Sequence, residues 1–336
     1  MMKVVVDRFG GPDVLRVVEE PTPKPGAGQV LVRITSIGMN HAELMARAGH
    51  YKLSSGEPPF TPGIESGGVI DAVGAGVTHR KPGQRVVLSL GQPRRKGDGR
   101  EGAYRSHIAC AAEETLAAPD NLPDEQLGAV WLPYLTAWGC LVWKQDVRHE
   151  QTVAIPAASS SVGIAAAQVC RERGVTTIGL TTSPDKVDRL RQMPEAPFDH
   201  LVVTRDRDWR EDLRRITGNR GVDVFFDPVA AGEYLDHEIR CVAQHGTIWV
   251  YGLLAQPGPV DVSPLIHKHA AIRGWVLWEM LAHPDVLEQG CRHILDNLAN
   301  GNYRLHVERT FHLDDVRAAH EYMEKGQHIG KLVLVP

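Results

Sequence analysis

The hydrophobic and polar positions follow two different patterns along the chain. Up to about Asp120, short runs rich in β-branched residues, such as VLVRIT and QRVVLSL, alternate with turns rich in proline and glycine. Such runs are typical of strands. The pattern therefore predicts a β-rich domain over residues 1–121.

From about Leu122 to Leu254, an apolar run followed by an amphipathic helical segment recurs; the runs are TVAIPA, TTIGLTT, HLVV, VDVFFDP and GTIWVYG. This alternation builds a parallel sheet with helices on both faces. We therefore expect a doubly wound α/β domain over residues 122–262, and a sixth strand in AAIRGWVLW can extend its sheet to residue 278. Residues 279–336 end in the strand KLVLVP, which we expect to return to the first domain because it has no neighbouring strand of its own.

The first strand-to-helix turn of this α/β domain has the sequence AIPAASSSVGIAAAQ. Gly163 stands where close packing of the helix on the strand forbids a side chain. Hydroxyls and backbone N–H groups ahead of it can bind a phosphate at the helix N-terminus, and they belong to Ser159, Ser160, Ser161 and Val162. The alternative is a serine-capped core helix without a ligand, but the succession of strand–helix units favours a nucleotide site.

Composition excludes several functional classes. The 336 residues suffice for two domains, and the net charge of −4 provides no broad basic field, so we expect no nucleic-acid partner. We expect the one dense basic run, PRRKGDGR, to form a solvated loop. The absence of a long apolar run and of a signal-peptide pattern predicts a cytoplasmic protein without a membrane span. The five cysteines are widely spaced, which predicts buried free thiols.

Five segments of the chain resemble the zinc-independent quinone oxidoreductase branch of the medium-chain dehydrogenase/reductase superfamily. They are PGAGQVLVRITSIGMNHAEL, PGIESGGVIDAVGAGVTHRKPGQRV, LPYLTAWGCL, AASSSVGIAAAQ and DPVAAGEYLD, in the order and spacing of that family. The resemblance implies a GroES-like catalytic domain made from both ends of the chain and a Rossmann domain. It also implies that substrate and nicotinamide meet in the cleft between these domains.

The residues at the zinc-ligand positions of this superfamily predict that the protein binds no zinc. The positions that match the catalytic zinc ligands of related alcohol dehydrogenases hold Asn40, Ile64 and Leu132, of which the last two cannot ligate a metal. The four-cysteine loop of those relatives is also missing between Leu90 and Ala111, and we expect nearby His41 and His50 to be polar surface. Without a Lewis acid, we expect hydride transfer from the nicotinamide to a small apolar quinone or α,β-unsaturated carbonyl compound.

The end of the second parallel strand favours NADPH over NADH. An NAD site usually carries an acidic residue there, whereas this chain has hydroxyls and then cations, which suit a 2′-phosphate: Thr181, Thr182, Ser183, Lys186 and Arg189. We expect Asp185 to lie in the first helical turn, facing away. The alternative is a helix cap with exposed basic residues.

The resemblance implies further cofactor contacts, at Thr136, Thr204, Arg205, Asp227 and Gly252. For Thr204 and Asp227, capping a helix is as well supported as contact with the cofactor.

For catalysis, the resemblance points to Asn40 and Tyr51, as donors to a developing oxyanion and, for Tyr51, of a proton. Met45 replaces an aromatic residue of some relatives, which argues against flat stacking of a quinone. The alternatives are that Asn40 caps a turn and that Tyr51 covers the loop.

The resemblance also implies two alternative functions and an oligomeric state. Enoyl thioester reduction and nucleotide-dependent regulation with little turnover are the alternative functions. Relatives commonly dimerise through edge strands of the Rossmann sheet, so we expect a homodimer. The candidate edge holds Trp275 and Trp278, either as interface anchors or as core residues.

Overall fold

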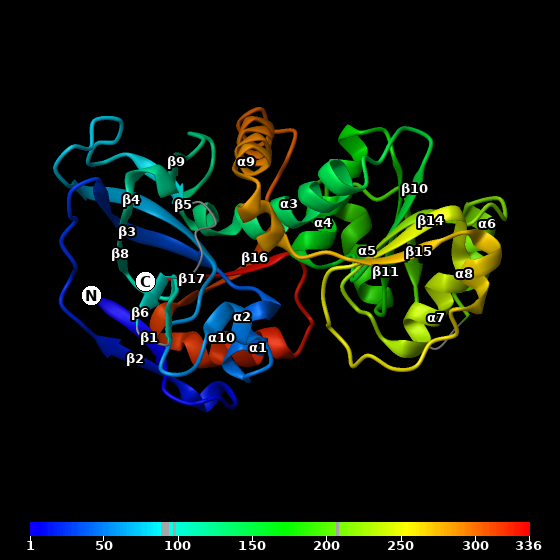
Figure 1. The fold of residues 1–336 in the computed structure, drawn as a ribbon, viewed down its shortest axis with the longest axis horizontal. Coiled ribbons are helices and arrows are strands. Elements are labelled where there is room, and N and C mark those ends of the chain that lie inside the picture. The colour runs from blue at the N-terminus through cyan, green and yellow to red at the C-terminus, as the bar shows by residue number, and fades with distance from the viewer. Residues whose placement is uncertain (89–93, 97–98, 206–207) are drawn as a thin grey trace. The chain divides into compact units, whose positions relative to one another are not determined.

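The computed structural model describes residues 1–88, 94–96, 99–205 and 208–336, and it divides into two compact units (Figure 1). Unit 1 contains Met1–Leu132, Leu295–Gly301 and Leu305–Pro336, and unit 2 contains Pro133–Ile294 and Asn302–Arg304. The first limit falls later than residue 121, because the short helix η3 (Asp124–Ala129) packs on the strands of unit 1. Both ends of the chain lie in unit 1 (Figure 1).

Unit 1 is built on a mostly antiparallel sheet in which β16, β17, β3, β4, β5 and β9 follow one another and β8 also pairs with β3. Their bounds are β3 Gln29–Gly38, β4 Glu65–Val73, β5 Arg85–Leu88, β8 His107–Ala111, β9 Thr115–Ala117, β16 Val307–His312 and β17 Lys331–Val335. Two small sheets pair β1 (Met2–Val6) with β2 (Leu15–Glu19) and β6 (Arg94–Lys96) with β7 (Gly99–Glu101). The helical elements are η1 Pro12–Val14, α1 His41–Arg47, α2 Lys52–Ser55, η2 Ala112–Glu114, η6 Leu313–Asp315 and α10 Val316–Glu324.

The alternation of side chains along β3 fixes how this sheet packs. Val30, Val32 and Ile34 are buried, whereas Arg33 between them is exposed, as expected for a strand with one face toward the core. The last strand, β17, pairs antiparallel with the end of β3, with Val333 opposite Gly38. The end of the chain therefore returns to the first domain, as the sequence predicts.

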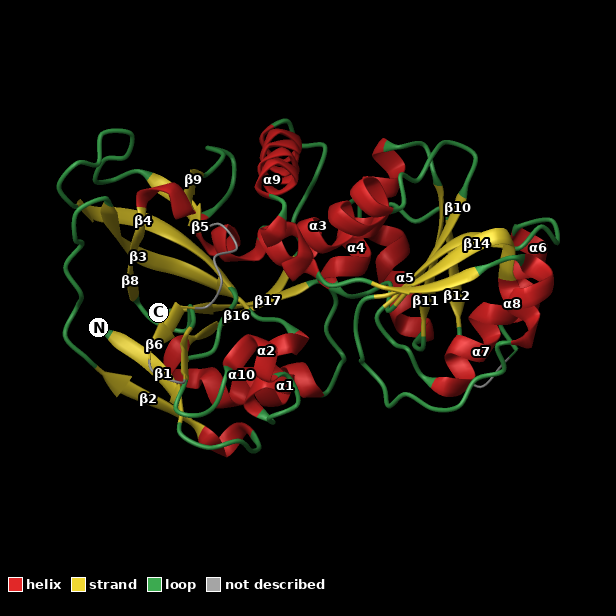
Figure 2. Ribbon diagram, in the orientation of Figure 1, coloured by secondary structure: helices red, strands yellow, loops and turns green. Residues whose placement is uncertain are grey.

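Unit 2 is built on six parallel strands in the order β12, β11, β10, β13, β14 and β15. Helices flank this sheet (Figure 2). The strands are β10 Thr152–Pro156, β11 Thr176–Thr181, β12 His200–Val203, β13 Val222–Asp227, β14 Val242–Val250 and β15 Ala271–Gly274. The helices are α3 Trp131–Trp138, η4 Gly139–Lys144, α4 Ser161–Glu172, α5 Pro184–Gln192, α6 Arg210–Ile216, α7 Gly232–Cys241, α8 Ser263–Lys268, η5 Leu277–Ala282 and α9 Pro284–Ala299, of which α3 and α9 continue into unit 1.

This strand order confirms the predicted α/β class. The order reverses between β10 and β13, and ligands of open parallel sheets bind beyond the carboxyl ends of strands at such a reversal. The central strand β10 is covered on both faces, since every one of its residues is buried.

Two details differ from the sequence expectations. The sixth strand ends at Gly274, and Trp275 is a buried core residue whose indole N–H donates to the carbonyl oxygen of Thr136 (3.1 Å). Trp275 is therefore no interface anchor, and Trp278 lies in η5 beyond the strand. The basic run expected as a loop contributes to strands β6 and β7, while Pro93, Gly97 and Asp98 lie outside the described residues.

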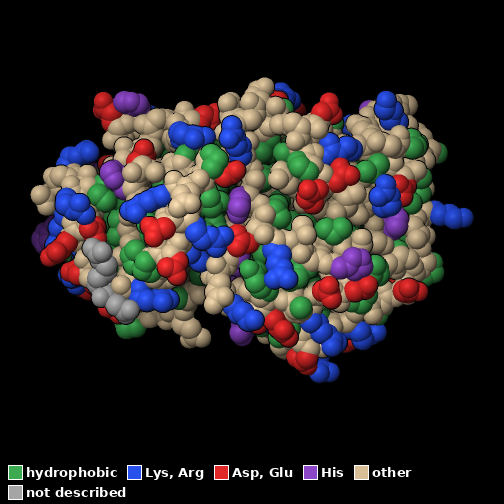
Figure 3. Space-filling view, turned by 180° about the vertical axis from the view of Figure 1, so that it is seen from behind, with side chains coloured by type: hydrophobic (Ala, Val, Ile, Leu, Met, Phe, Trp, Pro, Cys, Tyr) green, Lys and Arg blue, Asp and Glu red, His purple; other side chains and the backbone are tan. Residues whose placement is uncertain are grey.

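Other expectations on side chains hold. All five cysteines are buried, and none of them forms a disulfide, as predicted. Basic and acidic side chains are interspersed over the face shown in Figure 3. Among the described residues, no helix is long and apolar enough to cross a membrane.

Candidate functional site

The serine turn of unit 2 forms a capped helix N-terminus. Ser160 is the N-cap of α4, and its hydroxyl accepts a hydrogen bond from the backbone N–H of Gly163 in the first turn (3.0 Å). A Cβ atom at Gly163 would lie 2.9 Å from the carbonyl oxygens of Ala157 and Ala158. The close packing predicted for this glycine is therefore confirmed, and α4 directs its N-terminus toward the carboxyl edge of the sheet.

A lysine from the neighbouring turn reaches the serine turn. β11 ends at Thr181, and the hydroxyl of Ser183 caps α5 by accepting from the backbone N–H of Lys186 (3.4 Å). The ammonium group of Lys186 donates to the hydroxyl of Ser159 (3.1 Å). An ammonium group, a hydroxyl and a helix N-terminus thus lie side by side, and this combination suits a phosphate.

The other predicted cofactor residues near this edge differ in exposure. Asp185 lies in the first turn of α5 and is exposed, as expected. The exposed members of the predicted set are Thr182, Arg189 and Arg205. The backbone N–H of Thr204 donates to the carbonyl oxygen of Thr181 (2.9 Å), which joins the ends of β11 and β12.

Asp227 closes the turn after β13. Its carboxylate accepts hydrogen bonds from the backbone N–H groups of Val229 (2.6 Å) and Ala230 (2.9 Å), and its burial raises its pKa to about 6. These contacts hold the turn ahead of α7, whose N-cap is Ala231, so Asp227 is not the cap of that helix, and its cofactor contact stays a prediction. Gly252, after β14, packs so closely that a Cβ atom there would lie 3.0 Å from the carbonyl oxygen of Pro228.

In unit 1, Asn40 precedes α1 and is buried among polar partners. Its amide oxygen accepts a hydrogen bond from Lys331 of β17, and its amide nitrogen donates to the carbonyl oxygen of Gly38 (3.3 Å). Its backbone N–H donates to the carboxylate of Glu43 (2.7 Å). Lys331 also forms an ion pair with Glu65, so the side chains of two strands and one helix meet at Asn40.

The remaining residues of the predicted catalytic region lie around α1 and α2. Tyr51 is half-buried at the start of α2, and Met45 of α1 is half-buried as well. His50 is exposed, and burial lowers the pKa of the half-buried His41. Within the described residues, no group of three or more histidine, cysteine, aspartate or glutamate side chains is placed to hold a metal ion.

Sequence reasoning missed the three charged residues of this cluster: Glu43, Glu65 and Lys331. Two signals were present. Glu43 follows Asn40 by three residues, the spacing of a capping box, and Lys331 and Glu65 are charges beside the apolar runs LVLVP and GGVI. Charges at such positions are rarely buried unless they are paired.

Comparison with known proteins places this arrangement in a family. Residues 26–120 match the family described as "Alcohol dehydrogenase GroES-like domain", and residues 197–334 match the one described as "Zinc-binding dehydrogenase". A 2-haloacrylate reductase from a Burkholderia species is 30% identical over 342 residues, covering 100% of this chain and 99% of the relative. The chain belongs to the medium-chain dehydrogenase/reductase superfamily.

Within this superfamily, the relatives include quinone oxidoreductases. The human quinone oxidoreductase is 27% identical over 342 residues, covering 100% of this chain and 98% of the relative. The Escherichia coli quinone oxidoreductase, solved in complex with NADPH, is 25% identical with a TM-score of 0.87, and 100% of each chain is covered. The predicted quinone oxidoreductase branch is therefore confirmed, and the protein is an oxidoreductase.

Proposed function

We propose that this protein transfers a hydride from NADPH to a quinone or an α,β-unsaturated carbonyl compound, without zinc. The observation that carries the proposal is the contact between Lys186 and Ser159 beside the N-terminus of α4. It provides a cation at the end of β11, where a 2′-phosphate of NADPH would lie in a Rossmann site. Among the related proteins, the E. coli quinone oxidoreductase was solved with NADPH bound.

The residues of unit 2 fit the cofactor as follows. Backbone N–H groups at the start of α4 would hold the pyrophosphate, since Gly163 lets the helix approach closely. Lys186 would bind the 2′-phosphate. Further contacts are assigned to residues that follow β11 and β12 or lie in α5: Thr182, Ser183, Arg189 and Arg205. We also assign cofactor contacts to Thr136 of α3 and, along the remaining strand ends, to Thr181, Thr204, Asp227 and Gly252.

The chemistry of the reaction divides between cofactor and protein. Bound NADPH supplies the hydride. The amide of Asn40 would donate a hydrogen bond to the carbonyl oxygen of the acceptor as negative charge grows there. Tyr51 would then give a proton to the resulting enolate or hydroquinone anion. Asn40, Ile64 and Leu132 occupy the zinc-ligand positions of related alcohol dehydrogenases. The Asn40 amide would therefore stabilise the negative charge on the oxygen, as zinc does in those relatives.

The names of two relatives agree with both kinds of acceptor. The human relative is a quinone oxidoreductase, and the Burkholderia relative is a reductase of 2-haloacrylate, an unsaturated acid. Both acceptors have an electron-poor carbon that can receive a hydride in conjugation with an oxygen. We therefore assign an electron-poor conjugated acceptor as the substrate class.

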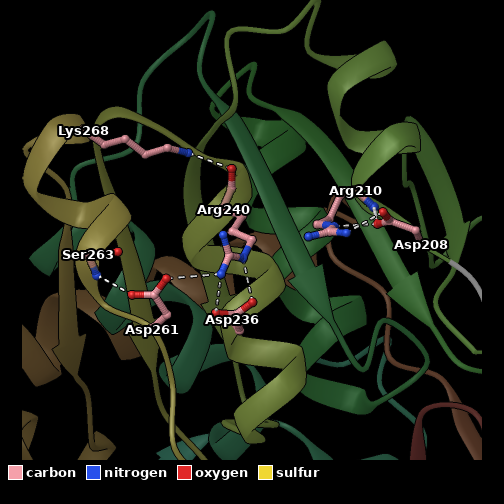
Figure 4. Close-up of polar contacts among 7 residues, drawn as sticks. All are labelled: Asp208, Arg210, Asp236, Arg240, Asp261, Ser263 and Lys268. Atoms are coloured by element: carbon pink, nitrogen blue, oxygen red, sulfur yellow. Dashed lines mark hydrogen bonds and ion pairs between the residues drawn. The ribbon is translucent and has the colours of Figure 1, made fainter.

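We also propose that the protein is a homodimer joined along β15, the edge strand of unit 2. α8, which precedes this strand in the chain and packs on β14, has no buried residue; its Ile266 is 72% exposed and its N-cap residue Val262 is 54% exposed. The ion pair of Arg240 with Asp261 and the hydrogen bond of Lys268 to the backbone oxygen of residue 240 fasten α8 to α7 (Figure 4). Lys268 also donates to the backbone oxygen of residue 242. A fixed apolar surface beside an open sheet edge suits a second copy of the chain.

We also propose a cytosolic location. Five buried cysteines without a disulfide support it, because disulfides are rare in cytosolic proteins.

An acceptor screen tests the proposed function. NADPH oxidation is followed at 340 nm with a quinone, a cyclic enone, an acrylate and an enoyl thioester, and each reaction is repeated with NADH. We expect turnover with NADPH and the quinone or enone. Turnover with the thioester alone would redirect the assignment to enoyl thioester reduction. Tight NADPH binding without turnover of any acceptor would favour a regulatory protein.

A further inference from the structure

A buried charge cluster in unit 1 joins three separate elements. Glu43 of α1, Glu65 of β4 and Lys331 of β17 are each 2% exposed. Lys331 donates to Glu65 and to the amide oxygen of Asn40. Burying such charges is costly even when they are paired, and well-packed apolar side chains often serve stability as well. The cluster therefore calls for an explanation other than stability.

The cluster holds the three positions that carry zinc ligands in related alcohol dehydrogenases. The two carboxylate oxygens of Glu43 accept from the backbone N–H groups of Asn40 (2.7 Å) and Ile64 (3.1 Å). The second oxygen of Glu65 accepts from the backbone N–H of Leu132 (2.9 Å). Each of the three positions is thus fixed by a carboxylate of this cluster.

The chain makes room for the cluster at Gly38. A Cβ atom at Gly38 would lie 2.6 Å from a carboxylate oxygen of Glu65 and 2.8 Å from Cε of Lys331. The same atom would lie 2.1 Å from the carbonyl oxygen of Gly128. A side chain at this position would displace the lysine from its partners.

Lys331 also decides which way the amide of Asn40 points. An ammonium group can only donate, so the group of Asn40 that faces it must be the oxygen. The amide nitrogen then faces the other way, and its contact with the carbonyl oxygen of Gly38 uses one of its two hydrogens. A positive charge at the amide oxygen also draws electrons from the nitrogen, which makes the second N–H a stronger donor.

We propose that Lys331 is a positioning residue, which orients and polarises the Asn40 amide so that it donates to the acceptor's oxyanion. This inference rests on the proposed function for the oxyanion, but the orientation of Asn40 can be measured without any reaction. Lys331 acts through Asn40 and touches neither substrate nor cofactor in this account. Its partner Glu65 holds the ammonium group in place.

The first test observes the amide directly. Protein labelled with [15N]asparagine shows the side-chain N–H signals of Asn40, which Asn40→Ala assigns by their loss. We expect Lys331→Met to shift these signals and to speed their hydrogen exchange about tenfold or more. Lys3→Met is the matched control, because Lys3 is a buried lysine of the same unit that pairs with Glu20 and Glu101. Unchanged Asn40 signals in Lys331→Met would overturn the proposal.

The second test is a double-mutant cycle on turnover. We expect Asn40→Ala to lower kcat on the order of a hundredfold and Lys331→Met about tenfold, with the affinity for NADPH unchanged. In the Asn40→Ala background, Lys331→Met should have almost no further effect. A full tenfold loss in that background would show that Lys331 acts on the fold and not through Asn40, which contradicts the proposal.

A charge-balanced variant keeps the test valid if Lys331→Met does not fold. Lys331→Met with Glu65→Gln removes both charges, and the glutamine can still accept from Leu132. This variant should give the same exchange and kinetic results. An Asn40 amide that responds as expected in a protein without turnover of any acceptor would contradict the proposed function and uphold Lys331 as the residue that orients Asn40.

Discussion

Glu238 of α7 is a fully buried carboxyl group, and neither of its oxygens has a hydrogen-bond partner within the described part of the chain. Burial, and then the nearby charge of Asp227, raise its pKa well above the usual range. A raised carboxyl pKa means that the folded protein holds the proton more tightly than the unfolded chain. The stability from this group is therefore present at low pH and is lost as the pH rises above about 4.5.

Replacement of this group should stabilise the protein at alkaline pH. We expect Glu238→Met to raise the free energy of unfolding by about 1–3 kcal/mol at pH 8 and by less at pH 5, because an unpaired buried carboxyl group is costly. Urea unfolding at both pH values measures this. Glu233→Met, at an exposed position of the same helix, is the control and should change little. A less stable Glu238→Met protein at pH 8 would show that Glu238 has a favourable partner.

In our proposal, the preference for NADPH over NADH depends on Lys186. We expect Lys186→Ala to raise the KM for NADPH about tenfold or more and to leave the KM for NADH nearly unchanged, since only NADPH carries the 2′-phosphate. Steady-state kinetics with both cofactors measure the ratio. The control is Arg191→Ala, which removes an exposed cation of the same helix. Equal effects of Lys186→Ala on the two cofactors would remove the reason for assigning NADPH.

The proposed role of Tyr51 as proton donor is tested by Tyr51→Phe, which removes one hydroxyl and keeps the ring. We expect turnover of a good enone to fall by roughly ten- to a hundredfold, or about 1.4–3 kcal/mol, with NADPH binding unchanged. Single-turnover kinetics separate this chemical step from product release. Unchanged turnover would make Tyr51 a pocket wall and leave Asn40 or ordered water as the donor.

At the scale of elements, the sequence was most informative where local rules decide the structure. The close packing at Gly163 was predicted, and the serine cap was the alternative to a nucleotide site; both could be read from the sequence because hydrogen bonding and packing at a helix N-terminus depend on adjacent residues. The end of α7 was less predictable. The helical pattern continues through Val242–Gln244, yet β14 begins at Val242, because pairing with β13 outweighs the local preference there.

The polar cluster around Asn40 could not be predicted from local pattern. Lys331 contacts Asn40 across 291 positions of sequence, and only the pairing of β17 with β3 brings them together. A single lysine at the start of an apolar strand is usually a solvated strand end. Its burial becomes evident only when the partners Glu65 and Asn40 are placed.

The surface of α8 allows a test of assembly at this scale. We expect Ile266→Asp to convert a dimer to a monomer at micromolar concentration, because a charge would be buried against the second copy. Light scattering coupled to size exclusion measures the mass. His149→Asp adds a charge at another exposed site and should leave the mass unchanged. A monomeric parent protein would reject the proposed dimer.

For the whole molecule, the two units supply different parts of one proposed reaction. Unit 2 presents the nucleotide turn with Lys186 and Ser159, and unit 1 presents Asn40 on its buried charge cluster. The sequence predicted both units and the parallel sheet, since alternating patterns and the order of motifs extend over the whole chain. It could not identify the acceptor, because the shape of an apolar pocket depends on long-range packing.

Isotope transfer in metal-free protein tests whether the protein moves a hydride from NADPH to the acceptor without zinc. The protein is treated with a strong chelator, shown by elemental analysis to lack zinc, and supplied with a cyclic enone and NADPH deuterated at C4 in either configuration. We predict that the metal-free protein turns over as fast as the untreated protein does with the same cofactor. With one of the two labelled cofactors, the reduced product should carry deuterium at the β-carbon. A product without deuterium from either cofactor, or turnover that returns only when zinc is added, would contradict it.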